Sequence, residues 1–248
     1  MDRKVETVIE MLQHLDFIVY IVQVGSSIRE KNPKDIDLLV GVLSPSEDTY
    51  QTVCKVLRRN GIDGIERSDD ALRFNFEESV FDVALYAHKN VYDIVTGVVT
   101  GTLLEGRLAH WATKAWLPEG FCADLRNGRV LQDKSGLLES LIKSIKIYPK
   151  VFREKILERC SLEIKNKLNE LGKFPPGSIE STLVRSDLIA ALIRYAFAYD
   201  KIYLRSYKKL DESAKELRVR GRKIFSLAAQ VNNTDIYSIH QQIEKIIS

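Results

Sequence analysis

The chain has 248 residues, of which 45% are hydrophobic and 29% charged, and its formal net charge is +3. This composition is typical of a globular protein, and the length is enough for one large or two modest domains. The apolar runs are only as long as strands, which argues against a membrane span, and the charged N-terminus lacks the apolar centre of a signal peptide. The three cysteines are scattered along the chain, which favours free thiols in a reducing cytoplasm over disulfides or a zinc site.

Hydrophobic periodicity in the first half of the chain predicts short strands combined with amphipathic helices. Ser46 is a suitable N-cap for one of these helices, and Gly61 is a suitable stop for it. The predicted elements are a helix over 5–15, strands over 17–24 and 36–43, a helix over 46–59, and strands over 64–67, 72–76 and 80–87.

The second half is predicted to be mainly helical. Helical periodicity covers 91–108, and Gly, Pro and Asn signals within 116–136 indicate turns and a short hairpin. Further helices are expected over 137–147, 150–171, 181–206, 212–229 and 235–247. The sequence therefore predicts an α+β fold, with a small mixed β-sheet and packed helices in residues 1–110 and an all-α helical bundle in residues 111–248.

The most informative stretch is a Gly-Ser turn followed by two closely spaced aspartates. Gly25, Ser26 and Ser27 follow an apolar strand, and Asp35 and Asp37 stand at the head of the next one. Residues i and i+2 of a strand point to the same face, so the two carboxylates should project side by side. Adjacent carboxylates repel each other unless a cation neutralises them, and oxygen ligands without His or Cys suit Mg²⁺. Backbone N–H groups of the turn could bind the phosphates of a nucleotide.

This arrangement resembles the nucleotidyltransferase superfamily that includes DNA polymerase beta. That family's pattern continues with a third carboxylate on a later strand, and Asp82 fits this position within an apolar run. The combination with a helical second half is similar to the aminoglycoside and lincosamide nucleotidyltransferases, in which a helical domain closes the cleft and contacts the substrate.

The resemblance implies specific roles for the residues of the motif. Asp35, Asp37 and Asp82 would be catalytic and would bind Mg²⁺, with two ions present when a nucleoside triphosphate is bound. Gly25, Ser26, Ser27 and Arg29 would contact that nucleotide. Whether Asp82 is a metal ligand or the general base stays open on sequence grounds.

The resemblance is looser in the second half. A lysine within a Tyr-x-x-Lys-like stretch often reaches the nucleotide in relatives, and Lys208 is the matching candidate, although the usual Asn and Pro are absent here. Some relatives use a further glutamate as base, for which Glu105, Glu139 and Glu180 are equal candidates. Most basic residues of the C-terminal third are expected on solvated helix faces, with a few able to face a triphosphate or an anionic partner.

The expected activity is therefore Mg²⁺-dependent transfer of a nucleoside monophosphate, with ATP as the favoured donor, to an acceptor hydroxyl of a small molecule or protein. One alternative is a non-catalytic or antitoxin-type nucleotidyltransferase-fold protein that acts through a protein partner; a homodimer is also open. Another is a template-independent RNA-end polymerase, but the small net charge and short length speak against nucleic acid as a partner.

Overall fold

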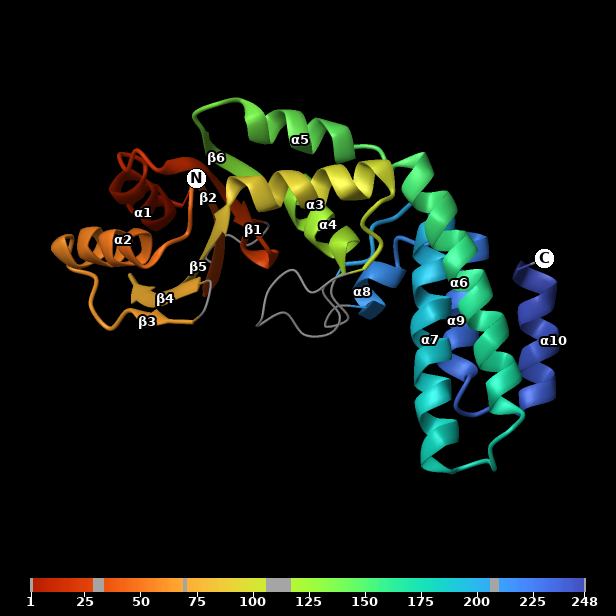
Figure 1. The fold of residues 1–248 in the computed structure, drawn as a ribbon. Coiled ribbons are helices and arrows are strands. Elements are labelled where there is room, and N and C mark those ends of the chain that lie inside the picture. The colour runs from red at the N-terminus through yellow and green to blue at the C-terminus, as the bar shows by residue number, and fades with distance from the viewer. Residues whose placement is uncertain (1, 29–33, 69–70, 106–116, 206–209, 248) are drawn as a thin grey trace. The chain divides into compact units, whose positions relative to one another are not determined.

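The computed structural model describes residues 2–28, 34–68, 71–105, 117–205 and 210–247 (Figure 1). The chain forms two compact units. The first comprises residues 1–98 and 105–147, and the second comprises residues 99–104 and 148–248. None of the helices in the described ranges is long and apolar enough to cross a membrane.

The first unit contains a six-stranded mixed sheet with the strand order β3-β4-β5-β2-β1-β6. β2 and β5 run parallel in the middle of the sheet, whereas the other neighbouring strands are antiparallel. The strands are β1 (Ile18–Val24), β2 (Asp35–Val42), β3 (Glu66–Arg67), β4 (Ala71–Phe76), β5 (Ser79–Ala87) and β6 (Arg129–Asp133).

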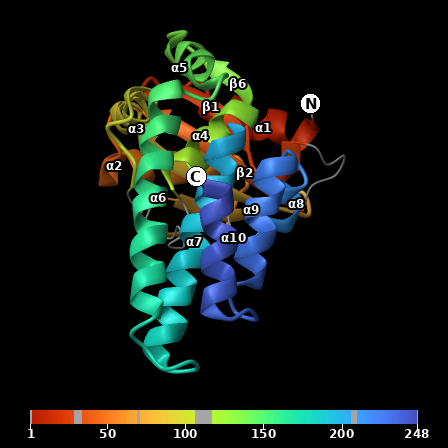
Figure 2. The same ribbon diagram turned by 90° about the vertical axis from the view of Figure 1, so that its right-hand side faces the viewer.

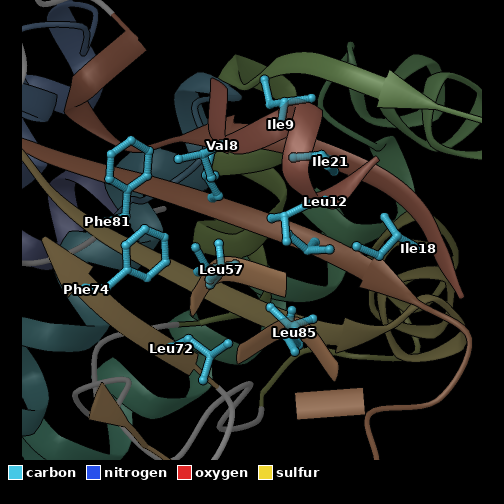
Figure 3. Packing of buried hydrophobic residues seen from close by; sticks show 14 of the residues in the cluster. Val8, Ile9, Leu12, Ile18, Ile21, Leu57, Leu72, Phe74, Phe81 and Leu85 are labelled. Carbon is cyan, nitrogen blue, oxygen red and sulfur yellow. The ribbon is translucent and has the colours of Figure 1, made fainter. Parts of the chain in front are cut away.

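One face of the sheet is buried beneath α1 (Arg3–Leu12) and α2 (Glu47–Arg59). Figure 3 shows Val8 and Leu12 of α1 and Leu57 of α2 among the strand residues that form this core. The alternation of strand side chains explains the arrangement, because every second residue of β2 and β5 is apolar and points to this face. Ser46 caps α2 in a capping box, as its sequence predicts.

The other face of the sheet is covered by α4 (Pro118–Asn127), which follows α3 (His88–Thr100). Phe121 of α4 meets the ring of Tyr86 edge to face at a centroid distance of 5.8 Å. At the other end of α4, Gly128 lies against Val22 of β1, where a Cβ atom would come within 2.7 Å of a Val22 methyl group. The carboxylate residues predicted from the sequence belong to this α4-facing side.

The predicted boundary near residue 110 differs from the division that the structure shows. We predicted turns and a hairpin within 116–136, but this region forms α4 and then β6, which pairs with β1 rather than with a neighbouring strand. α5 (Leu137–Ile145) follows β6 in the same unit. Pairing between β1 and β6 connects segments about a hundred residues apart, so local periodicity carries no signal for it.

The second unit is helical, and Figure 2 shows its long helices side by side. α6 packs along α7, α7 along α9, and α10 contacts both α9 and α6. The helices are α6 (Lys150–Leu171), α7 (Ile179–Asp200), α8 (Leu210–Ala214), α9 (Val219–Gln230) and α10 (Ile236–Ile247).

The single helix predicted over 212–229 is wrong, because α8 and α9 are separate helices. The break is fixed by Asp200, whose buried carboxylate accepts a hydrogen bond from the backbone N–H of Arg218 at 2.6 Å. Arg222 also donates to the carbonyl oxygens of Lys215 and Leu217 at 3.2 and 3.1 Å. Asp200 lies outside the segment predicted as one helix, so the periodicity of that segment alone did not show the break.

Candidate active site

The Gly-Ser turn lies directly at the end of β1 and is shaped by its glycine. Gly25 has a φ angle of +76°, in the left-handed region that favours glycine. A Cβ atom at this position would overlap the Oδ2 atom of Asp37, which lies beside Val24 in the pairing of β1 with β2. Gly25 is therefore required by both the backbone conformation and the close approach of a predicted catalytic carboxylate.

Buried side-chain hydrogen bonds between the end of β1 and the turn hold the turn in place. Gln23 donates from Nε2 to the hydroxyl of Ser27 at 3.1 Å, and that hydroxyl donates to the carbonyl oxygen of Val24 at 3.3 Å. Gln23 and Ser27 are both buried. The Ser27 side chain thus holds the turn in place, and its predicted contribution to nucleotide binding rests on the backbone. The side chain of Ser26 lies outside the part that the structure describes.

Three predicted carboxylates belong to adjacent strands on one face of the sheet. Asp35 and Asp37 are two residues apart on β2, and Asp37 is the direct register partner of Asp82 on β5. Register partners on neighbouring strands point to the same face. Asp35 is exposed, whereas Asp37 and Asp82 are half-buried. The motif spacing identified Asp35 and Asp37 and the family resemblance implied Asp82, but only the parallel pairing of β2 with β5 places Asp82 beside Asp37.

The charge of Asp82 is under opposing influences. Its pKa is raised above the ordinary value mainly by burial; the Arg73 guanidinium lowers the pKa, and the negative charge of Asp35 raises it further. Arg73 is the register partner of Asp82 on β4, and its Nη1 atom lies 3.6 Å from Asp82 Oδ2. Arg73 was not singled out from the sequence, because nothing local marks an arginine as the cross-strand neighbour of a carboxylate.

The expected Mg²⁺ ion would need oxygen donors from the carboxylates of this site. Among the described side chains, no group of three or more His, Cys, Asp or Glu residues is arranged to hold a metal ion. Mg²⁺ does not require such a group, because it is commonly bound through one or two carboxylates together with substrate phosphates. Asp35 and Asp37 supply hard oxygen donors, and the absence of a side chain at Gly25 lets the Asp37 carboxylate lie against the turn, so these residues fit the ion.

A second arginine that the sequence did not reveal lies beside the turn. Arg129 on β6 is the register partner of Gln23 at the end of β1, and its Nη2 atom is 3.5 Å from the carbonyl oxygen of Ile28. Its exposed guanidinium therefore adds positive charge next to the Gly-Ser turn. The sequence around Arg129 reads as a turn, and only the β1–β6 pairing brings it here.

The remaining candidates are not brought into this group. Arg29 and Lys208 lie outside the described residues. Of the three glutamates considered as a base, Glu105 is exposed at the end of a described segment, Glu139 is in the first turn of α5, and Glu180 is in the first turn of α7. These positions do not favour any one of the three glutamates as the general base.

Comparisons with known proteins identify the fold. No model of a known protein family matches the chain, and no curated protein matches its sequence. The chain is similar to the crystal structure of a nucleotidyltransferase-like protein from Exiguobacterium sibiricum 255-15, with a TM-score of 0.52 and 10% sequence identity. The alignment covers 99% of this chain and 73% of that one.

The fold is nucleotidyltransferase-like. The predicted α+β fold class is confirmed, with a mixed sheet and a helical part. Within this fold, the Gly-Ser turn at the end of β1 and the carboxylates at the start of β2 lie next to each other. The aminoglycoside or lincosamide subtype stays a prediction, because identity at this level is evidence about fold alone.

Proposed function

We propose that this protein is a Mg²⁺-dependent nucleotidyltransferase that moves a nucleoside monophosphate, AMP from ATP as the favoured case, to a hydroxyl group of a small molecule or protein. The observation that carries the proposal is the close packing of Gly25 against Asp37, with Asp82 in register on the next strand. This combination brings a glycine turn and two carboxylates together in a nucleotidyltransferase-like fold.

The turn and the neighbouring arginine would bind the β- and γ-phosphates. Successive backbone N–H groups in a turn with a left-handed residue such as Gly25 are suited to anions, and residues 25–27 form such a turn. The Arg129 guanidinium would add a charge-assisted contact to a phosphate oxygen. Arg29 is proposed for the same role from its sequence position.

Asp35 and Asp37 would hold the metal ion, with phosphate oxygens completing its coordination. When bound, Mg²⁺ neutralises charge on the phosphates and favours departure of pyrophosphate. Two ions with the nucleotide bound would also engage Asp82, as the family resemblance implies.

The reaction itself is a substitution at the α-phosphorus. The acceptor oxygen forms a bond to this phosphorus, and the bond between this phosphorus and the oxygen that bridges the α- and β-phosphates breaks. Pyrophosphate leaves with the electron pair of the broken bond. The hydroxyl proton must pass to a base, and the raised pKa of Asp82 makes its carboxylate a better proton acceptor than an ordinary aspartate. Asp82 is therefore proposed either as this base or as a ligand of the second ion.

The deciding experiment measures thermal unfolding with each nucleoside triphosphate, with and without Mg²⁺. We expect the wild type to be stabilised by Mg-ATP, because a ligand that binds only the folded state raises the melting temperature. The Asp35→Asn/Asp37→Asn variant should show no such shift. The matched control, Asp16→Asn/Asp63→Asn, removes two exposed carboxylates of the same unit and should respond like the wild type.

An absence of any nucleotide-dependent shift in the folded wild type would reject the proposal. If a shift is found, a screen for pyrophosphate release with candidate hydroxyl compounds and proteins would identify the acceptor.

A further inference from the structure

The two units carry charge of opposite sign. Residues 148–248 contain 19 Lys and Arg against 12 Asp and Glu, a formal charge of +7. The chain as a whole carries +3, which leaves −4 for residues 1–147. Residues 99–104, which belong to the same unit, have no charged side chain. The excess is concentrated at the start of α9, where four of the six residues from Arg218 to Lys223 are basic.

This concentration opposes the electrostatics of the helix. The N-terminal end of a helix favours negative side chains, yet the first turn of α9 contains no acidic residue. The basic side chains also repel one another at this spacing. Such an arrangement reduces stability, and a functional requirement for positive charge would explain it.

The cations point along one side of the helix. Arg218, Arg222 and Ser226 are spaced by four residues, and Val219 and Lys223 form the adjoining row, so all five share one side of α9. With Leu217 they line a groove of about 560 Å³, a size suited to a small ligand. Leu217 is buried and gives the groove an apolar floor, while the cations and the Ser226 hydroxyl are exposed.

Two of the cations are available for a ligand. The side chains of Arg218 and Lys223 form no hydrogen bond or ion pair with any residue that the structure describes. Arg222, in contrast, donates to the carbonyl oxygens of Lys215 and Leu217, which follow α8. Two carboxylates near this stretch are already engaged. Asp200 accepts from the Arg218 backbone, and Glu216 pairs with Arg205 at 3.3 Å.

We propose that this α9 groove, defined by residues 217–219, 222, 223 and 226, binds the phosphate group of a phosphorylated small molecule. Arg218 and Lys223 supply the charge, Ser226 supplies a hydroxyl donor, and Leu217 and Val219 contact the carbon part of the ligand. The phosphate is assigned to these side chains and not to the backbone at the start of α9, because the Asp200 carboxylate accepts from Arg218 N–H and lies against Gly221 there. The residues of the groove all belong to the second unit, whereas Gly25, Asp37 and Asp82 belong to the first.

The test uses inorganic phosphate as the probe and backbone amide NMR shifts as the readout. Titration of the wild-type protein should shift the amides of residues 217–226 in a saturable manner. Arg218→Gln/Lys223→Gln should weaken this binding at least tenfold, because it removes the two unpaired charges and leaves the Arg222 contacts intact. The control Lys173→Gln/Lys245→Gln loses the same charge from exposed positions of the same unit and should bind as the wild type does.

Several results would overturn the proposal. These are an absence of saturable shifts at residues 217–226, equal weakening in both double variants, or binding of a 5′-phosphorylated single-stranded RNA without binding of inorganic phosphate. The last result would assign the groove to a nucleic-acid backbone instead. Thermal stabilisation by Mg-ATP should persist in Arg218→Gln/Lys223→Gln, so failure of the groove and failure of the nucleotidyltransferase proposal are separable.

Discussion

Gly25 and Asp37 are packed so closely that any side chain at position 25 would overlap the Asp37 carboxylate. The turn and the carboxylate therefore form one structural feature, although they are separated by eleven residues of sequence. A change in either should disturb the other.

Gly25→Ala should destabilise the protein by about 3 kcal/mol and abolish the stabilisation by Mg-ATP. The positive φ angle destabilises an alanine by roughly 1–2 kcal/mol, and the alanine side chain would also displace Asp37. Gly64→Ala is the matched control, because Gly64 has a φ of +65° and a Cβ there would meet nothing within 4 Å. Chemical denaturation of both variants separates the two effects, and equal losses would refute a specific role of the Asp37 contact.

Asp37→Asn should lower the rate of nucleotidyl transfer by about 10²–10³ while leaving the fold intact. The amide keeps the shape of the side chain but loses the charge that would hold Mg²⁺, and removal of one such electrostatic contact commonly has this effect. Steady-state pyrophosphate release measures the loss, with Asp16→Asn as the control. Wild-type activity in Asp37→Asn would exclude it as a metal ligand.

Arg73→Gln should shift the acidic limb of the pH–rate profile to higher pH. Burial, followed by repulsion from Asp35, raises the pKa of Asp82, and Arg73 opposes this, so loss of the guanidinium should raise the pKa further. Arg59→Gln, which changes an exposed arginine of α2, should leave the profile in place. An unchanged profile in Arg73→Gln would show that ionisation of Asp82 does not limit the reaction.

The same carboxylate should affect stability with a defined sign. Because its folded-state pKa is raised, the folded protein binds the Asp82 proton more tightly than the unfolded chain does, and stability falls as pH rises from the ordinary value of 3.8 through the folded-state pKa. Asp82→Asn should remove this decrease. Urea denaturation across the acidic range, comparing the two proteins, measures the difference in slope, and parallel curves would contradict the prediction.

Gly221→Ala should destabilise the second unit even though alanine favours helices. Alanine gains about 1 kcal/mol over glycine inside a helix, but a Cβ at Gly221 would overlap the Asp200 carboxylate that caps α9. Gly172→Ala, at the end of α6 with one contact at 3.7 Å, should be neutral or slightly stabilising. Thermal unfolding should therefore show a lower melting temperature for Gly221→Ala and no decrease for Gly172→Ala, and stabilisation by Gly221→Ala would contradict the packing argument.

The sequence by itself determined the local elements and the central motif. Short apolar runs predicted β1, β2, β4 and β5, helical periodicity predicted α1, α2 and α6, and Ser46 marked the start of α2. These signals are local, because side-chain direction repeats with backbone geometry and capping depends on near neighbours. The spacing of Gly25, Asp35 and Asp37 was readable for the same reason.

Only the tertiary structure decided which distant residues meet. The parallel register of β2 and β5 places Asp82 beside Asp37, and the antiparallel register of β4 adds Arg73. β6 pairs with β1 within the first unit, which includes residues 105–147, and this pairing brings Arg129 to the turn. These pairings depend on burial of whole faces and on hydrogen bonds between remote strands, which no short window of sequence contains.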